Sequence, residues 1–466
     1  MAHIEHPLAW AVAAHRDPDQ AARYTRYRRY HDGDHDLSFA TPRYESTFGQ
    51  LFSSFSYNRC AVVVDAHADK LAVETFVAAQ EAATEIASDI WMRNRMDQRA
   101  GEVHKEAFRA GDGYCIVWPE TNLVTMDGAA VPTIWPQKAS HIRVHYDDER
   151  PGLITLASKA WMLHSKRMRL NLYFPDRIEK YITSTRAHSG IPHSAGAFER
   201  YEADGEPWPV PNLWGVVPVF HFANNADTGD YGRSELRDVI PLQNALNKVL
   251  TDIILTSELA GFPQKVILGI DGMDPNNQDA LKRLEGGLNK IFTIPTGAGD
   301  SPVSITEFSA ANLIQLVAVA ELFDKTISRT SRVPVHFLQM SGDFPSGAAL
   351  RTAESPFTSK IEDRQVAFGN VWENVMALAL RQAGMENTEG LRVVWKPAAP
   401  VTEDELWNRA VAQKAAGMPF AAILREMGKS QDEIAQIMLD KDAAVEQAMR
   451  AFDGGVFAGD QSEDAA

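Results

Sequence analysis

The sequence predicts an α+β fold in which long helices and a largely antiparallel sheet occupy different parts of the chain. Apolar residues recur at steps of three and four over 234–261, 309–332 and 348–384, which is typical of long amphipathic helices. Between residues 114 and 182, short runs rich in β-branched and aromatic residues alternate with turn sequences such as DERPG and PDR, which is typical of antiparallel strands. Helices and strands segregated in this way indicate the α+β class.

The three long helical patterns have recognisable ends. In the first, Ser234 offers an N-cap oxygen, and Gly261 followed by Pro263 ends the pattern. The second stops before Pro334, because the residue before a proline is pushed out of the α region. Pro356 lies inside the third pattern and should kink that helix or mark its true start.

The stretch 263–308, which separates the first two long helices, predicts short strands and turns. The strands are expected near 265–268, 290–294 and 303–308. A connector at 334–348, which contains two glycines and a proline, then leads to the third helix. A β-rich segment at the far end of two long helices is unusual for an enzyme core. It indicates a part that contacts other proteins.

The region before the long helices predicts helices followed by strands. Residues 58–111 are expected to be helical, and Gly111-Asp112-Gly113 ends this region and starts the strand series. The six strands expected between 114 and 182 would form one largely antiparallel sheet. Residues 184–215 are polar and rich in proline and glycine, so we expect a long surface loop that meets neighbouring subunits.

The C-terminal part predicts a strand and then three helices. The strand and a linker are expected within 386–400. Thr402 with Glu405 is a capping box for the first helix, Pro419 begins a short second helix, and Ser430 with Glu433 caps a third helix that runs to about residue 452. The acidic residues after 455 are expected to be disordered.

Composition and charge limit the class of protein. The chain has 466 residues, of which 45% are hydrophobic and 23% charged, and this is ordinary for a soluble globular protein. A net charge of −16 argues against a protein that grips nucleic-acid phosphates tightly. We expect an intracellular product without membrane contact, because no apolar run is long enough for a bilayer and the N-terminus lacks a signal-peptide pattern. Cys60 and Cys115 are expected to be reduced and buried.

No motif indicates catalysis or a cofactor. A phosphate-binding loop, GxGxxG and HExxH are all absent from the sequence, so any ATP-driven motor must be another protein. A cluster of acids and histidines could hold a divalent cation, but it lacks the glycine and the closing glutamate of a calcium loop. Its members are His31, Asp32, Asp34, His35 and Asp36. The sequence therefore predicts a non-enzymatic protein with no assigned catalytic residue, cofactor or metal.

Three other features have a functional and a structural interpretation. The Arg/Tyr-rich run 23–30 could bind nucleic acid, but a helix that buries its tyrosines and exposes its arginines is the preferred interpretation. The single histidines His67 and His104 are expected to be structural. Cations of the third long helix could contact DNA, although a solvated face is the simpler explanation. They are Arg351, Lys360 and Arg364.

An ordered series of segments resembles a known family. GRSELRDVIPLQNALNKVLTDIILTSELAGFPQKVILG, followed by SGDFPSGAALRTAESPFTSKIEDRQVAFGNVWENVMALAL, is similar to the central region of portal proteins of long-tailed (siphovirus-type) bacteriophages, in the branch common in phages of actinobacteria. The resemblance continues upstream in YRRYHDGDHDLSF and downstream in MPFAAILREMGKSQDEIAQI, so it covers about residues 24–440. No single motif is diagnostic, and the order of the segments carries the match.

The resemblance implies the portal-protein fold and its division into parts. We expect a mixed wing domain at 1–232 and a long wing helix with a return strand at 349–400. Two stem helices, a clip between them, a tunnel loop, a helical crown and a disordered tail make up the remainder. Their expected ranges are 233–262 and 309–333 for the stem, 263–308 for the clip, 334–348 for the tunnel loop, 401–454 for the crown and 455–466 for the tail.

The resemblance also implies a function and a set of partners. Portal proteins form a ring at one capsid vertex, and the resemblance implies a dodecamer for this chain. The ring is the conduit for packaging and ejection of double-stranded DNA. Expected partners are the terminase large subunit, the head-completion adaptor and the major capsid protein, and a scaffold protein is a further candidate. The protein would be assembled in the host cytoplasm and reside in the virion, and an acidic ring would give passing phosphates few places to bind.

Site residues follow from the same resemblance. Residues of the tunnel loop are candidates to face DNA: His336, Gln339, Ser341, Asp343 and Ser346. Residues of the clip are candidates to contact the adaptor: Lys265, Asp271, Asp274, Lys282 and Lys290.

Two alternative functions stay open at this point. One is a metal-dependent nuclease or hydrolase that uses the cluster at residues 31–36. The other is a different structural protein of the virion, such as a capsid or tail adaptor, although it leaves the order of long helix, clip, long helix, loop and long helix unexplained.

Overall fold

The computed structural model describes most of the chain. The described residues are 4–36, 57–124, 130–187, 190–203, 205–261, 265–268, 291–294, 304–307, 313–338, 347–399, 403–427 and 431–456. The chain divides into two compact units, Met1–Ala398 and Ala399–Ala466. Among the described helices, none combines the length and the apolar composition that crossing a membrane requires.

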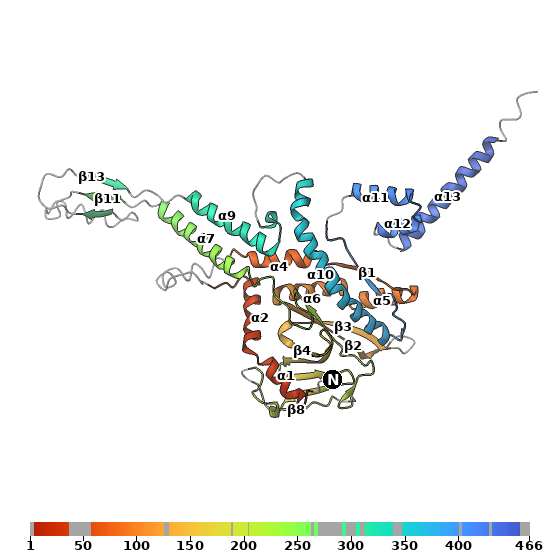
Figure 1. Cartoon of the computed structure of the whole chain (residues 1–466), viewed down its shortest axis with the longest axis horizontal. Helices are drawn as coiled ribbons and strands as arrows, with labels where there is room; N and C mark the ends of the chain where they lie inside the picture. Colours follow the sequence, from red (N-terminus) through yellow and green to blue (C-terminus); the bar gives the residue numbers. More distant parts are fainter. Residues whose placement is uncertain are drawn as a thin grey trace, which may run out of the picture. The chain divides into compact units, whose positions relative to one another are not determined.

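The first unit begins with a series of helices that one strand interrupts along the chain (Figure 1). In chain order they are α1 (Pro7–His15), α2 (Pro18–His31), α4 (Arg59–Asp69), β1 (Val73–Val77), α5 (Glu81–Arg93) and α6 (Met96–Ala110). The tyrosines of α2 face inward as expected, since Tyr24 and Tyr30 are buried while Arg23 and Arg26 are exposed.

The expectation of helix throughout 58–111 was wrong at two places. Val73–Val77 is β1, which pairs antiparallel with β14 (Arg392–Trp395) from the far end of the unit. The second helical stretch is broken at Arg95, whose backbone is left-handed with φ 52°. The amide of Asn94 bonds backbone groups of Pro132 and Ile134 instead of continuing the helix. Both deviations depend on partners that are distant in sequence.

The strands within residues 112–223 form two antiparallel sheets, whereas one sheet was expected. The first sheet has the order β10-β2-β3, and the second has the order β4-β5-β6-β7-β8, with β9 also paired to β7. A single turn of 3-10 helix, Ala139–His141, separates the two sheets along the chain. The bounds are β2 (Asp112–Val124), β3 (Ala130–Gln137), β4 (Ile142–Tyr146), β5 (Ile154–Met162), β6 (Met168–Tyr173), β7 (Arg177–Thr183), β8 (Phe198–Arg200), β9 (Val210–Pro211) and β10 (Val219–Ala223).

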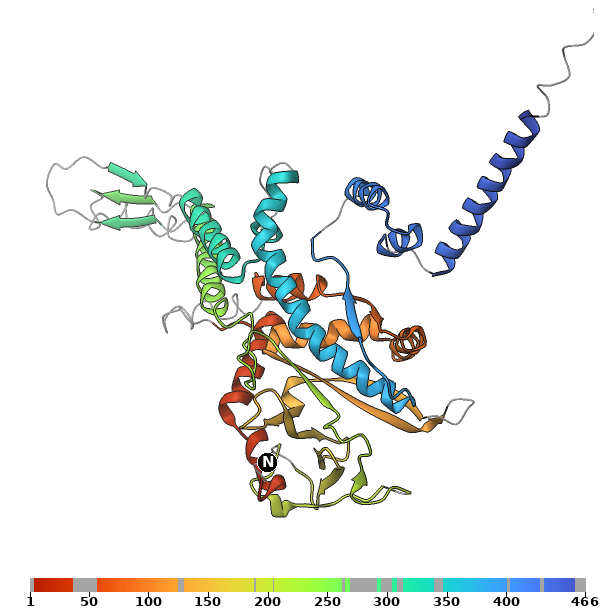
Figure 2. The ribbon, with the colours of Figure 1, turned by 45° about the vertical axis from the view of Figure 1, so that its right-hand side comes forward.

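The long helices are present, with one corrected start. They are α7 (Ile240–Gly261), α9 (Leu313–Ser331) and α10 (Gly347–Gln382), and α7 packs beside α9 (Figures 1 and 2). Ser234 does not cap α7, which begins six residues later. Its Oγ donates to the carbonyl of Arg109 at 2.5 Å, and this bond holds the segment 234–239 against the end of α6 as turns.

The helix α10 passes through its internal proline. It begins at Gly347, so Pro356 does not mark its start. Figure 2 shows α10 as one ribbon that changes direction between its first turns and its C-terminal half, which agrees with the expected kink.

The stretch between α7 and α9 contains the three expected strands. They are β11 (Lys265–Leu268), β12 (Ile291–Ile294) and β13 (Ser304–Glu307), in the order β12-β11-β13. β13 runs antiparallel to β11, but β12 runs parallel to it. A parallel neighbour needs a long connection, and residues 269–290 provide the length.

The main core of the first unit gathers around α10. Trp372 is fully buried, meets the ring of Trp91 edge-on at 5.2 Å and donates from Nε1 to Nε2 of His104 at 2.8 Å. The ring of His104 also stacks on Phe368 at 5.7 Å. The expectation of buried, unpaired cysteines is confirmed for Cys60 and Cys115.

In its described residues, the second unit contains three helices, as the capping signals indicated. They are α11 (Glu403–Ala415), α12 (Phe420–Glu426) and α13 (Gln431–Val456). The last helix runs a turn beyond the expected end at residue 452. Of the tail 455–466, which was expected to be disordered, the first two residues belong to α13, and the others lie outside the described residues.

The buried histidines predict a pH-dependent stability. Burial lowers the pKa of both His67 and His104 to about 4. The unfolded chain, with histidine pKa near 6.5, therefore binds more protons between about pH 6.5 and about pH 4, and the free energy of unfolding falls as the pH falls through this range. We expect the free energy of unfolding, measured by urea denaturation, to drop between about pH 7 and pH 5 by at most ~1.4 kcal/mol per pH unit for each histidine.

The control for this prediction is the variant His104→Gln. It should be less stable than the native chain near pH 7 but should lose less stability on acidification. An unchanged pH slope in this variant would contradict the assignment of the effect to His104.

Candidate functional site

The base of the α7–α9 pair is held by buried polar contacts. Arg59 of α4 donates from Nε to Oδ1 of Asp324 at 2.9 Å and from Nη2 to Oδ2 at 3.0 Å, and both side chains are about 10% exposed or less. The backbone N–H of Arg59 donates to Oε1 of Gln243 at 2.8 Å. Two parallel N–H···O bonds of this type are directional, so α4 fixes the position of both helices.

A polar side of α7 continues these contacts to α2. Tyr30 donates from its hydroxyl to Oδ1 of Asn244 at 2.9 Å. His35 donates from Nε2 to the carbonyl of Tyr30 at 2.9 Å and accepts at Nδ1 from Asn247 at 2.8 Å. Burial lowers the pKa of His35, which favours this neutral form.

The acid and histidine cluster at residues 31–36 is therefore occupied by protein contacts. Arg29 donates to carboxylate oxygens of Asp34 at 2.7 Å and of Asp36 at 3.0 Å. His31 approaches Asp65 at 3.3 Å. Within the described residues, no group of three histidine, cysteine or acidic side chains is placed to hold a metal ion.

The outer part of α9 exposes an apolar face. Four of its large apolar side chains are exposed: Ile314, Val317, Val319 and Leu322. Ile314 is 79% exposed and Leu322 is 59% exposed, although they lie on the same helix as the buried Asp324 and Ile327. The four side chains spread over about half of the helix circumference, and we call them together the α9 apolar face.

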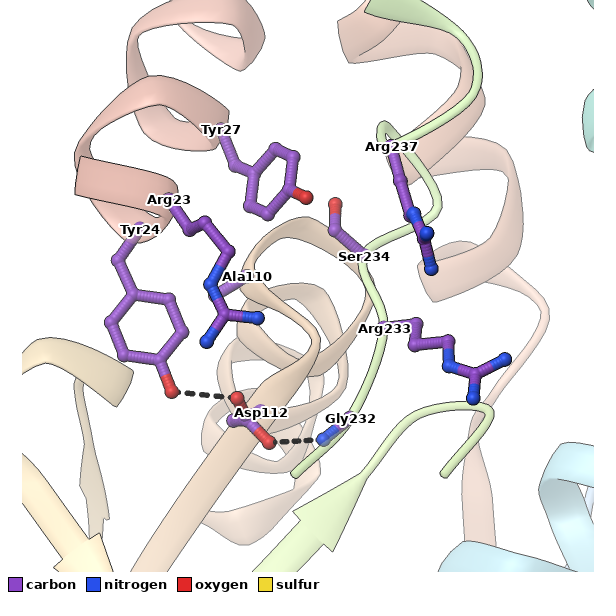
Figure 3. Close-up of a pocket in the computed structure, with 9 residues that line it drawn as sticks. All are labelled: Arg23, Tyr24, Tyr27, Ala110, Asp112, Gly232, Arg233, Ser234 and Arg237. Atoms are coloured by element: carbon purple, nitrogen blue, oxygen red, sulfur yellow. Dashed lines mark hydrogen bonds between the residues drawn. The ribbon is translucent and has the colours of Figure 1, made fainter. Parts of the chain in front are cut away.

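A second junction, around Asp112, joins α2 and the β10-β2-β3 sheet to the segment that precedes α7 (Figure 3). The buried carboxylate accepts from the hydroxyl of Tyr24 at 2.6 Å, from Nε2 of His221 at 2.8 Å and from the backbone N–H of Gly232 at 2.7 Å. The backbones of Gly111 and Gly232 touch so closely that a Cβ on Gly232 would lie 1.9 Å from the carbonyl oxygen of Gly111. Only glycine fits there.

Arginines line the open side of this junction. Figure 3 shows Arg23, Arg233 and Arg237 around the pocket, with Asp112 toward its base. Burial, and next the charge of Asp112, raise the pKa of Tyr24 well above its ordinary value, so the tyrosine stays a donor. The junction ties α2, β2 and β10 to the chain just before α7.

A third contact connects α10 to the segment before α7 and to the end of α9. Lys360 donates from Nζ to Oε2 of Glu235 at 2.5 Å and to the carbonyl of Ser331 at 3.0 Å, and its side chain is only 13% exposed. The sequence analysis expected Lys360 either to contact DNA or to face solvent, and both interpretations were wrong. Arg364, by contrast, reaches only the side chain of Asn225, at 3.3 Å.

The predicted site residues are only partly within the described chain. His336 lies in the short turn Val335–Phe337, and its Nε2 is 3.0 Å from Oε1 of Glu354 on α10. Lys265 is the first residue of β11, opposite Ile291 and Glu307. The other candidates lie outside the described residues: Gln339, Ser341, Asp343, Ser346, Asp271, Asp274, Lys282 and Lys290.

The sequence reasoning missed the charged residues that hold these elements together. They are Arg59, Asp112, Glu235 and Asp324. One signal was available for Asp324, which interrupts the apolar stripe of α9 between Phe323 and Ile327. A charge within an apolar stripe indicates a buried partner.

Comparison with known proteins identifies the family. The family model described as "Phage portal protein, SPP1 Gp6-like" matches residues 13–447. The chain belongs to this portal protein family. The resemblance of the ordered segments is thereby confirmed, and the chain is a structural component of a phage particle.

Individual relatives agree. The portal protein of Mycobacterium phage L5 is 27% identical over 371 residues, which are 75% of this chain and 70% of that protein. The portal protein of Mycobacterium phage D29 is 31% identical over 219 residues, which are 44% of each. A chain from the neck of a native gene transfer agent particle, computed with C12 symmetry, is 13% identical and superposes with a TM-score of 0.44. The aligned region covers 88% of this chain and 98% of that chain.

The buried Lys360 contact of this portal protein predicts a large stability effect. Lys360→Met leaves the carboxylate of Glu235 mostly buried without its cation, so we expect a loss of roughly 3–5 kcal/mol in the free energy of unfolding. Urea denaturation measures the loss. The matched control is Lys325→Met on α9, whose exposed pair with Glu321 at 3.6 Å should contribute less than ~1 kcal/mol. Equal losses in both variants would argue against a special role for Lys360.

Proposed function

We propose that about twelve copies of this portal protein close into a ring at one capsid vertex, and that the ring is the conduit for packaging and ejection of double-stranded DNA. The observation that carries the proposal is the α9 apolar face. The chain leaves this face uncovered within its described residues while it holds the base of the same helix with buried contacts. Family membership supports the same conclusion.

An uncovered apolar face of this kind favours a repeated contact between copies. Apolar side chains on a well-anchored helix gain stability when a second surface removes them from water. In a ring, each copy presents two different faces to its neighbours, and no face stays free once the circle closes. The α9 apolar face then packs against the stem of the next copy.

The parts of the chain receive their roles within this ring. Residues 1–232 and 349–400 form the wing, 401–454 the crown and 334–348 the tunnel loop that approaches DNA. The stem comprises 233–262 and 309–333, although its first helix starts at Ile240. These are the ranges that the sequence predicts.

The clip is the proposed docking site for the head-completion adaptor. Within the described residues, β12 and β13 are the outer strands of the clip sheet, and neither has a further strand on its free edge. A free edge offers backbone donors and acceptors to a strand of another chain. The terminase large subunit and the major capsid protein are further proposed partners, with assembly in the host cytoplasm and a scaffold as a transient partner.

The alternative functions lose their support. A metal-dependent nuclease required the cluster at residues 31–36, whose side chains are bonded to protein groups. A different kind of virion adaptor does not agree with the family match over residues 13–447. The net charge of −16 suits a conduit, because an acidic wall holds passing phosphates weakly.

The proposal is tested by the mass and symmetry of the purified chain. Native mass spectrometry and electron-microscopy class averages should show closed rings of about twelve copies with a central hole. Chains that remain monomeric both alone and when co-produced with the other head proteins of their phage would overturn it.

The α9 apolar face generates a specific prediction. Leu322→Asp should abolish rings, because the contact would bury an unpaired carboxylate, whereas the monomer should stay folded because the side chain is 59% exposed. Native mass spectrometry reports the rings and circular dichroism the fold. Thr330→Asp, which adds the same charge to an exposed position near the end of α9, is the control and should keep the rings. Rings in the Leu322→Asp variant would contradict the proposed contact.

A further inference from the structure

A groove lies between the two sheets of the wing, away from the stem and the Asp112 junction. It has a volume of about 310 Å³. One wall comes from β2 and β3 and is mostly apolar and aromatic, with Trp118 and Trp135. The opposite wall comes from β5, β6 and β7 and contains polar side chains, with Lys159, Asn171 and Lys180.

The polar wall is a cross-strand row. Lys159 is paired with Asn171, and Asn171 is paired with Lys180, so the three side chains stand on one face of the sheet. Lys180 has an acid partner, Glu206. No acid within salt-bridge distance of Lys159 is present in the described residues, and burial lowers the pKa of its ammonium group. Its nearest aromatic neighbour is the ring of Trp161 at 4.8 Å.

Asn171 is a second group without adequate partners. The residue is 8% exposed, and its Oδ1 has no hydrogen-bond partner in the described structure. Its Nδ2 makes only one long contact, of 3.5 Å, with the hydroxyl of Tyr173. Buried polar atoms are nearly always paired, so an unpaired amide in the wall of a groove points to a donor that arrives from outside.

The aromatic wall is suited to an apolar side chain. Trp135 is 45% exposed, its Nε1 donates to Oγ1 of Thr133 at 3.0 Å, and the guanidinium of Arg99 lies over its ring at 5.0 Å, so part of the ring surface stays open to solvent. Trp118 is held edge-on by Trp214 at 5.3 Å. The groove thus combines an aromatic surface, one uncompensated cation and one unpaired acceptor.

We infer that this groove binds an acidic peptide segment of a partner protein. An apolar side chain of the peptide packs on Trp118 and Trp135, a neighbouring carboxylate pairs with Lys159, and a backbone N–H donates to Oδ1 of Asn171. Each of these three groups of the peptide is complementary to one group in the groove. A nucleic acid is disfavoured, because its phosphates need a row of cations. In this groove Lys180 is paired with Glu206, and Lys159 is the one lysine of the lining without an acid partner in the described residues.

The experiment measures the charge preference of the groove on the full-length chain. Three capped peptides serve as probes, acetyl-Glu-Leu-Glu-amide, acetyl-Gln-Leu-Gln-amide and acetyl-Lys-Leu-Lys-amide, and saturation-transfer NMR reports weak binding of each. We expect the glutamate peptide to bind up to about fivefold more tightly than the glutamine peptide, and the lysine peptide to bind most weakly. Equal binding of the three peptides, or no saturable binding of any, would overturn the inference.

Variants assign the preference to named residues. Lys159→Met should remove the preference for the glutamate peptide, and Asn171→Leu should weaken all three peptides. Lys138→Met, which changes an exposed lysine outside the groove, should change neither. Persistence of the charge preference in Lys159→Met contradicts the proposed site.

The same variants separate this inference from the ring proposal. Lys159→Met should leave the number and size of rings unchanged in native mass spectrometry. A loss of rings in this variant would show that the groove receives a neighbouring copy, which would overturn the assignment to a partner protein. Rings that form normally without any peptide preference would leave the ring proposal intact and refute the groove.

Discussion

The arrangement of the stem depends on the buried ion pair between Arg59 and Asp324. The two residues come from α4 and α9, and their side chains are 8% and 10% exposed. A buried charge loses favourable hydration, which destabilises the folded chain unless an opposite charge compensates for it. Arg59 and Asp324 therefore each depend on the presence of the other. We interpret the pair as a device for position more than for stability, because its two parallel bonds accept only one placement of α9 relative to α4. Gln243 extends the same restraint to α7.

The helix α9 therefore has two kinds of surface. Near its end, Asp324 and Ile327 are buried against the wing, while farther out Ile314 and Leu322 face away from the described chain. A helix that is anchored at one end and apolar at the other can present a preformed contact to a neighbour without first being ordered, which reduces the entropic cost of association. The contacts of Lys360 and Asp112 supply further anchors, since they bring α10, α2 and the β10-β2-β3 sheet to the same region.

Much of the fold could be predicted from local patterns. The long helices, the three short strands between α7 and α9 and the C-terminal helices all follow from periodicity, capping and turn residues in their own segments. The errors occur where a distant partner decides. Val73–Val77 is a strand because it meets β14, and α7 begins only at Ile240 because Ser234 and Glu235 are hydrogen-bonded to backbone carbonyls at the end of α6. Of the candidate site residues, His336 was placed in the correct connector, but its contact with Glu354 had no local signal.

The sequence by itself determined the α+β class, the order of long helices around a β-rich insertion and, through that order, the family. These properties depend on patterns that each segment carries internally. Tertiary structure alone decided which charges are buried and what they contact. Lys360 illustrates the difference, since a lysine on a helix has the same local pattern whether it faces water or the carboxylate of Glu235. Periodicity reports which face of one element is apolar, but it contains no information about the element that lies opposite.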